Sequence, residues 1–166
     1  MLEKTGLRVL GISDVGGFCV FATNKRPIKT VADLKGMKIR TMTHEGHIAT
    51  MKALGAAPTP MTFAEVYTSL QTGVIDGHFN PISAMITFRM YEVQKYLSLT
   101  NHIYGAMYLM INDKWFKSLP EEYQDALVIA GREAAITARG MNRIMEASGL
   151  DFLREKGMEI ITPSAA

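Results

Sequence analysis

The sequence predicts an α/β fold in which a short, largely parallel sheet is flanked by helices. Short apolar runs bounded by glycine, proline or aspartate alternate along the chain with longer segments that carry helix-start signals. The chain has 166 residues, and 48% of them are hydrophobic, which is enough for one ordinary domain with its own core. No internal repeat, low-complexity stretch or linker divides the sequence.

The first forty residues predict three strands and one helical turn. Residues 7–12 and 18–22 are apolar runs separated by Gly16-Gly17, which favours two buried strands joined by a turn. Residues 30–33 (Thr-Val-Ala-Asp) have the capping-box spacing that begins a helical turn. Residues 37–40 alternate between apolar and basic side chains, as in a strand with one buried face.

The next part of the chain predicts two helices. Residues 45–54 follow a helical pattern and are followed by glycine, and residues 57–61 form an extended piece with two prolines. Residues 62–65 (Thr-Phe-Ala-Glu) are a full capping box, so we expect a helix over residues 63–72. Residues 74–75 provide the core of a very short strand.

The last part of the chain predicts three helices and two strands. Asn80 stands directly before a proline, which is typical of a helix N-cap. The expected elements are a helix over 81–96, a buried strand over 106–111, a short helix over 113–117, a long helical segment over 118–156 and a strand over 158–161. Three interior glycines lie in the long segment, and each weakens a helix by about 1 kcal/mol, so we expect a bend or a break there.

Composition excludes several classes of function. The net charge is +2 with basic and acidic residues interspersed, which disfavours nucleic acid as a partner. No apolar run approaches the roughly 18 residues that a membrane span requires. The single cysteine, Cys19, excludes an internal disulfide framework and a thiolate-rich zinc site. The first residues lack the basic and apolar regions of a signal peptide, so we expect no export signal in the chain as written.

The sequence contains no motif that predicts an enzyme or a cofactor. It has no GxGxxG, no phosphate-binding loop and no G-x-S-x-G. Cys19 lies in an apolar strand, where an inert buried thiol is the common case. His44 and His47 have a spacing that could hold a metal, but no further ligands accompany them, and two solvated histidines are the simpler interpretation. We therefore expect no cofactor, no metal and no catalytic residue.

Arg40 is a candidate for anion binding. It lies at the carboxyl end of a predicted strand, and ligands of open α/β sheets bind beyond such ends. A guanidinium can hold a carboxylate with two parallel hydrogen bonds, and the N-terminus of the following helix favours an anion. A surface arginine or a structural ion pair is the alternative interpretation.

Three other residues have both a structural and a functional interpretation. Asn80 is a natural helix cap, and a cap that faces the crevice can also donate to a ligand oxygen. Phe63 and Tyr67 lie four residues apart on one helical face, where core packing is the default.

Several motifs together resemble one protein family. They occupy residues 33–40 (DLKGMKIR), 55–67 (GAAPTPMTFAEVY), 70–77 (LQTGVIDG), 80–81 (NP) and 91–96 (YEVQKY). In this order and spacing they are similar to the extracytoplasmic solute-binding subunit of TRAP transporters (tripartite ATP-independent periplasmic transporters), of the type that binds dicarboxylates or sialic acid. The similarity extends over essentially the whole chain.

The resemblance implies a binding protein of two α/β lobes, with the type II periplasmic-binding-protein fold, that closes on an organic acid and delivers it to a membrane permease. It implies that Arg40 forms the salt bridge to the ligand carboxylate and that Asn80 and Phe63 line the cleft. We add Tyr67 and Phe79 to the candidate binding residues, and Phe79 stands where the family commonly has a carboxylate.

Two departures from the family narrow the expectation. Val20 stands where members of the sialic-acid type have a second arginine, which disfavours sialic acid as the ligand. Family members are also about twice as long as this chain, which resembles their second half.

By resemblance, residues 18–105 and 146–166 form most of the C-terminal lobe, and residues 1–17 and 106–145 are partial elements of the N-terminal lobe. The resemblance implies a periplasmic location and TRAP permease subunits as partners. Partial elements without their lobe expose strand edges and apolar helix faces, so we expect a homo-oligomer, most simply a two-fold dimer. The alternative function is a structural or interaction protein that folds and oligomerises without closing on a ligand.

Overall fold

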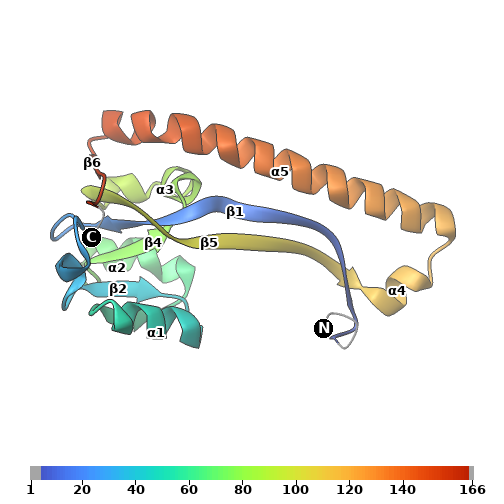
Figure 1. Ribbon diagram of the computed structural model, residues 1–166, viewed down its shortest axis with the longest axis horizontal. Coiled ribbons are helices and arrows are strands. Elements are labelled where there is room, and N and C mark those ends of the chain that lie inside the picture. The colour runs from blue at the N-terminus through green and yellow to red at the C-terminus, as the bar shows by residue number, and fades with distance from the viewer. Residues whose placement is uncertain (1–4, 165–166) are drawn as a thin grey trace.

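The computed structural model describes residues 5–164, which form a six-stranded mixed sheet with flanking helices (Figure 1). The strands are β1 (Leu7–Thr23), β2 (Lys38–Thr41), β3 (Ala57–Pro60), β4 (Gly77–Asn80), β5 (Tyr96–Asn112) and β6 (Glu159–Ile161). The α-helices are α1 (Glu45–Ala53), α2 (Val66–Gln71), α3 (Ile82–Thr87), α4 (Asp113–Lys117) and α5 (Glu121–Glu155), and short 3₁₀ helices span Val31–Leu34 (η2), Phe63–Glu65 (η3) and Met90–Glu92 (η4). Residues 1–4 and 165–166, which belong to the expected segments 1–17 and 146–166, lie outside the described residues.

The sheet confirms the predicted α/β class. Its strand order is β3-β2-β4-β1-β5-β6. The pairings β2–β3, β2–β4 and β5–β6 are parallel, whereas both pairings of β1 are antiparallel. The strands β2, β3, β4 and β6, the helices α1–α3 and the adjoining ends of β1 and β5 form a compact unit that we call the lobe (Figure 1).

β1 is one strand of 17 residues, so the prediction of two strands joined by a turn at Gly16-Gly17 was wrong. The glycines form a bulge instead, with φ angles of 122° and 86°. The Asp14 carboxylate stabilises this bulge because its Oδ1 accepts hydrogen bonds from the backbone N–H groups of both glycines, at 3.1 and 3.0 Å. Pairing with β5 resumes at Phe18 opposite Tyr104, and the strand continues into the lobe.

The part of β1 that precedes the bulge lies outside the lobe. It pairs with the later part of β5 in a two-stranded ribbon that ends near α4 (Figure 1). We call residues 7–14 and 104–117 the extension. The expectation that residues 106–111 form a buried strand was wrong in its burial, since residues 106–110 are exposed within β5.

Two other local predictions were also wrong. The strand after α2 is β4, at residues 77–80, and not residues 74–75. Asn80 is the last residue of β4 and caps no helix, because α3 begins at Ile82 with Pro81 in the cap position, and the helix ends at Thr87. Proline fixes the extended-to-helical transition by itself, so the asparagine side chain is left for other contacts.

α5 is one continuous helix of 35 residues, and the expected break at its glycines is absent. A Cβ atom added to Gly131 would lie 2.6 Å from the Cβ of Leu10 in β1, and one added to Gly149 would lie 2.7 Å from Ile82 in α3. These two glycines therefore allow the helix to pack closely on the ribbon and on the lobe (Figure 1). Tertiary packing outweighs their low helix propensity.

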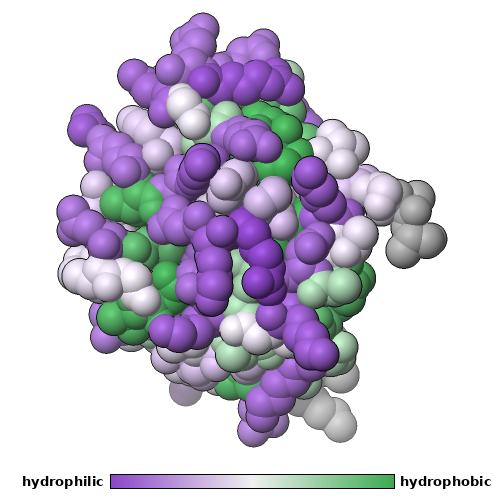
Figure 2. All heavy atoms as spheres, turned by 90° about the vertical axis from the view of Figure 1, so that its left-hand side faces the viewer, coloured by the Kyte–Doolittle hydropathy of each residue, from purple (hydrophilic) through white to green (hydrophobic). Residues whose placement is uncertain are grey.

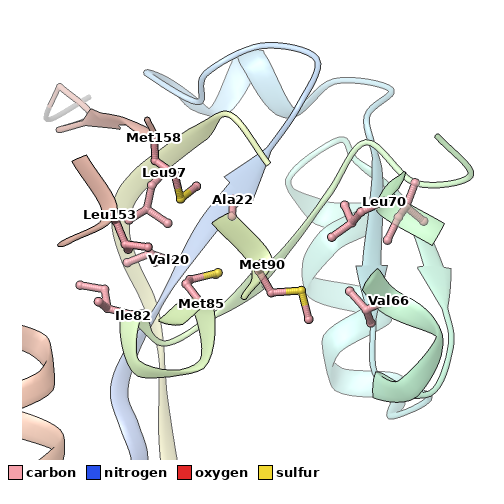
Figure 3. Close-up of a cluster of buried hydrophobic side chains, with 11 residues drawn as sticks. Val20, Ala22, Val66, Leu70, Ile82, Met85, Met90, Leu97, Leu153 and Met158 are labelled. Carbon is pink, nitrogen blue, oxygen red and sulfur yellow. The ribbon is translucent and has the colours of Figure 1, made fainter. Parts of the chain in front are cut away.

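The lobe has a hydrophobic core on each side of the sheet. The first core lies between the sheet, α2, α3 and the end of α5 (Figure 3), and its central residues include Val20, Met85, Leu97 and Leu153. The second core lies on the side of the sheet that α1 covers. Its residues include Phe21, Ile39, Phe79 and, from α1, Met51. Hydrophilic residues cover most of the outer end of the lobe, with smaller hydrophobic areas between them (Figure 2). Among residues 5–164, no helix has both the length and the apolar character to cross a membrane.

Candidate functional site: a buried arginine at the edge of the lobe

The candidate site is built around Arg40 at the carboxyl end of β2. β2 and β4 run parallel with Ile39 beside Gly77, so both strands end at the same edge of the sheet. The Arg40 side chain is only 6% exposed. Its Nε and Nη2 atoms donate hydrogen bonds to the backbone carbonyl of Met61, at 3.2 and 3.0 Å. The guanidinium is thus held in one orientation from one side.

The Arg40 charge has no acidic partner among the described residues, since none of the ion pairs within residues 5–164 includes it. Burial lowers the pKa of the guanidinium from its ordinary value, although an arginine stays charged in proteins. A buried cation without a counter-ion is costly. Its remaining N–H groups are a fitting partner for a carboxylate that approaches from outside.

Phe63 forms one wall beside this cation. The Cζ atom of Arg40 lies 5.6 Å from the centre of the Phe63 ring, and Phe88 packs edge-on against the ring at 4.7 Å. The predicted capping box holds the segment in place, because the Glu65 carboxylate accepts hydrogen bonds from the backbone N–H and the hydroxyl of Thr62. These hydrogen bonds lower the pKa of Glu65. The structure therefore brings Phe63 and Arg40 together.

Asn80 lies on the same face of the sheet as Arg40, at the same edge. Alternation along β4 puts His78 and Asn80 on one face, and the Nδ2 atom of Asn80 lies 2.8 Å from Nδ1 of His78. The Nε2 atom of His78 lies 2.8 Å from Oε1 of Gln94, whose Nε2 donates to the carbonyl of Ala22. His78 is fully buried, and burial lowers its pKa to about 4.

Phe79 points to the opposite face of β4 from Asn80. It is 5% exposed and belongs to the second core. Its ring lies 5.9 Å from that of Phe21, 5.6 Å from that of His47 and 5.3 Å from that of His102. In the described lobe its contacts are thus those of a core residue.

The side-chain hydrogen bond of Tyr67 runs to Glu92, away from Arg40, Phe63 and Asn80. Its hydroxyl donates to Oε2 of Glu92 at 2.8 Å, and this hydrogen bond raises the pKa of the tyrosine. The side chain packs beside the first core and lines a surface groove with Gln71 and Lys95, among others.

Val20, which the resemblance matches to the second arginine of sialic-acid-type members, is fully buried in the first core opposite Asn80 in the sheet. It therefore provides an apolar neighbour at the place where a second cation would stand.

The residues considered for other chemistry have structural surroundings. Burial raises the pKa of the Cys19 thiol to about 11, which keeps it protonated and unreactive at neutral pH. His44 caps α1, because its Nδ1 accepts from the backbone N–H of Gly46. Within residues 5–164, no group of three or more histidine, cysteine or acidic side chains is placed to hold a metal.

A hollow of about 410 Å³ opens on the other side of the lobe. Mostly apolar residues line it, among them Phe21, Ile28, Leu34 and His102, and Arg40 is not one of them. The apolar lining of this hollow is typical of a ligand pocket, but the uncompensated cation and the convergent strand ends favour the Arg40 edge.

Sequence reasoning missed two parts of this arrangement. Gln94 reaches the site from the segment between η4 and β5, 16 residues away from His78 in the chain, so no local spacing indicates their contact. His78 lies on the same face as Asn80 only because both belong to β4, a strand that the sequence does not predict at residues 77–80.

Comparisons with known proteins identify the family of the chain. A family model described as bacterial extracellular solute-binding protein, family 7 (DctP) matches residues 1–166. The 2,3-diketo-L-gulonate-binding periplasmic protein YiaO of Escherichia coli is 44% identical over 162 residues, which are 97% of this chain and 49% of the relative. The chain thus spans about half the length of the curated relatives it matches.

Solved structures show the same similarity. One of them is a TRAP periplasmic solute-binding protein from Sulfitobacter sp. NAS-14.1 with bound β-D-galacturonate. It has a TM-score of 0.93 at 33% identity, and the match covers 98% of this chain and 54% of the Sulfitobacter chain. One from Polaromonas sp. JS666, bound to D-erythronate, has a TM-score of 0.91 at 34% identity, with coverage of 98% and 53%. The chain belongs to the family of bacterial extracellular solute-binding proteins, family 7, the solute-binding proteins of TRAP transporters.

Proposed function

We propose that the chain binds the carboxylate of a small organic acid for TRAP-type uptake, with Arg40 as the anion clamp. The observation that carries this proposal is a buried guanidinium, fixed by the Met61 carbonyl and without an acidic partner, at the edge where two parallel strands end. Phe63 serves as an apolar wall and Asn80 as an orienting polar group. Relatives with bound galacturonate and erythronate support an acid as the ligand class, since both ligands carry a carboxylate.

Phe79 and Tyr67 have lesser parts in this proposal. Phe79 supports the strand that presents Asn80, through its packing on Phe21 in the second core. Tyr67 helps to fix the segment that follows Phe63, through its hydrogen bond to Glu92. Neither residue is assigned a direct ligand contact.

In the proposed arrangement, residues 18–105 and 146–166 act as the C-terminal lobe, and residues 1–17 and 106–145 belong with an N-terminal lobe that supplies the other half of the cleft. The bulge after Asp14, where β1 leaves the lobe, supports a boundary at that place. We assign the chain to the periplasm, with TRAP membrane permease subunits as partners, on the basis of its periplasmic relatives. Those relatives are solute-binding proteins, which supports a binding rather than an enzymatic role.

Replacement of the clamp tests the proposal. A ligand at 100 times its dissociation constant stabilises a protein by about 2.7 kcal/mol, so the wild-type chain should melt several degrees higher with D-erythronate or galacturonate present. We expect Arg40→Ala to weaken binding by about 30-fold or more, because removal of one partner of a buried charge pair costs about 2–5 kcal/mol.

Arg26→Ala is the matched control, since Arg26 also donates to backbone carbonyls, those of Asp33 and Lys35, but lies away from the β2–β4 edge. Isothermal titration of both variants gives the affinities. Arg40→Ala binding within a few-fold of wild type would show that another group holds the carboxylate.

The extension favours a second candidate function, self-association. Large apolar side chains on its two strands are about half exposed, among them Ile12, Met107, Tyr108 and Met110. Exposed apolar faces of this kind mark interaction surfaces, and two copies can cover each other by a two-fold pairing. In this alternative the chain is an interaction protein that oligomerises without closing on a ligand.

A further inference from the structure

A hydrogen-bond chain of three polar side chains stands beside Arg40 on its face of the sheet. Gln94 donates through Nε2 to the carbonyl of Ala22 at 2.6 Å, and its Oε1 lies 2.8 Å from Nε2 of His78. The Nδ1 atom of His78 lies 2.8 Å from Nδ2 of Asn80. His78 is 0% exposed and Gln94 is 5% exposed, so water cannot replace these contacts.

The polarity of this chain follows from its first member. The Ala22 carbonyl can only accept a hydrogen bond, so the nitrogen of the Gln94 amide must face it and the amide oxygen must face His78. The Nε2 atom of His78 must then carry the proton. In a neutral imidazole the other nitrogen is an acceptor, and burial keeps this histidine neutral at pH 7.

The same logic fixes the orientation of the Asn80 amide. An acceptor at Nδ1 of His78 requires a donor, so Asn80 turns its Nδ2 toward the histidine. Its Oδ1 atom and one N–H are then directed elsewhere, and no described residue donates a hydrogen bond to Oδ1. Asn80 is partly exposed at the edge where β4 ends, so this oxygen is available to a bound molecule.

We infer that His78 and Gln94 are positioning residues that hold Asn80 with its Oδ1 free as an acceptor, so that the site selects acids bearing a hydroxyl over acids bearing only carboxylate groups. This inference rests on the proposed function, because Arg40 must first bind the carboxylate. A hydroxyl of the ligand can donate to Oδ1, whereas a second carboxylate brings only acceptors to it. A site built to pair a hydroxyl discriminates against a ligand that leaves its polar group unpaired.

Two acids of four carbons test the selection. D-erythronate has one carboxylate and three hydroxyls, and succinate has two carboxylates and no hydroxyl. We expect the wild-type chain to bind D-erythronate about tenfold or more tightly than succinate in isothermal titration. Equal affinities, or a preference for succinate, would overturn the selection while leaving Arg40 as the clamp.

A Gln94→Leu variant tests the positioning role. Without Gln94, the proton of His78 is no longer confined to Nε2, the Asn80 amide can turn, and the preference between the two acids should fall to a few-fold or less. Gln124→Leu is the matched control, since Gln124 also donates to a backbone carbonyl, that of Leu119, at the far end of α5. An unchanged preference in Gln94→Leu would overturn the positioning role.

A measurement without ligand separates the two proposals. Nitrogen-15 NMR of the histidine side chains in the wild-type chain should show His78 at pH 7 with its proton on Nε2 alone, a readout that does not require a variant to fold. A proton on Nδ1, or on both nitrogens, would overturn the relay. Absence of binding by either acid would refute the proposed function, and the selection with it, even where the NMR result is as expected.

Discussion

At the scale of single residues, burial has opposite consequences for arginine and histidine in this lobe. Arg40 keeps its charge because a guanidinium cannot be neutralised in a protein. Its burial without an acidic partner is unfavourable, and a bound anion relieves this cost. His78 and His102 avoid the same cost by staying neutral, and burial lowers the pKa of each to about 4. The same burial thus leaves arginine charged, because of its high intrinsic pKa, and makes the two histidines neutral.

These histidines predict a pH dependence of stability. Their pKa is about 4 in the folded chain and 6.5 in the unfolded chain, so between these values the unfolded chain binds protons that the folded chain does not. The free energy of unfolding should therefore fall as the pH falls through this window, by up to about 3 kcal/mol for each histidine. Urea titrations at several pH values between 7 and 4 measure the slope.

Neutral substitutions provide the comparison for that slope. His78→Gln and His102→Gln cannot take up a proton, so each should flatten the loss of stability between pH 6.5 and 4. A slope that is the same in both variants and in wild type would mean that these imidazoles do not titrate in this window.

The sequence predicted single residues well where a local motif defines them. The capping boxes at Thr30 and Thr62 were read correctly because their hydrogen bonds span only three residues. Asn80 was misread because the same Asn-Pro pair fits both a cap and the end of a strand. Only the pairing of β4 with β1, formed by residues about sixty positions apart, decides between them.

At the scale of elements, close approach of backbones shapes α5 more than helix propensity does. Gly131 lies against Leu10 of β1, where an added Cβ would be 2.6 Å from a Cβ and 3.0 Å from a backbone oxygen. Gly140 has no atom within 4 Å of an added Cβ. Two glycines of one helix thus have different roles.

Alanine substitutions at these two glycines should have opposite effects. Gly140→Ala should stabilise the chain by about 1 kcal/mol, because alanine is the better helix former and nothing is displaced. Gly131→Ala should destabilise it by about 1–3 kcal/mol, because the added methyl group forces the helix away from β1. Thermal and urea unfolding of both variants measure the difference, and destabilisation by both substitutions would contradict this account of Gly140.

The predicted break in α5 and the predicted strand at residues 74–75 were wrong for related reasons. Helix propensity predicts a break at the glycines of α5, because it takes no account of packing. Two of these glycines, Gly131 and Gly149, lie against a neighbouring element. Propensity also favours Val74-Ile75 as a strand over residues 77–80, although the latter have a partner on either side in the sheet. Pattern and capping located most elements, whereas their pairing decided the remaining boundaries.

At the scale of the whole molecule, apolar surface is distributed unevenly. The outer end of the lobe is mostly hydrophilic (Figure 2), whereas Met107, Tyr108, Leu109 and Met110 are all exposed in succession along the extension. The sequence predicted the apolar character of this strand but not its exposure, because an apolar run does not tell which neighbour covers it.

We expect the extension to drive self-association of the chain. Met110→Lys places a charge on the exposed strand face and should weaken a dimer by about tenfold or more. Val74→Lys is the control, since Val74 is also about half exposed but lies in the lobe. Light scattering over a range of concentrations measures both. A wild-type chain that stays monomeric at about 100 μM would contradict the expectation.

The ribbon of β1 and β5 also has a consequence for how the chain reaches its structure. Arg8 and Asp113, which lie side by side where the ribbon ends, are 105 residues apart in sequence. Residues 7–14 of β1 are made before β5 and pair with no other strand of the described chain. Closing so long a loop is slow, and contacts of high sequence separation lower folding rates. This topology therefore predicts slow folding, during which the apolar strand β1 is exposed until it pairs with β5.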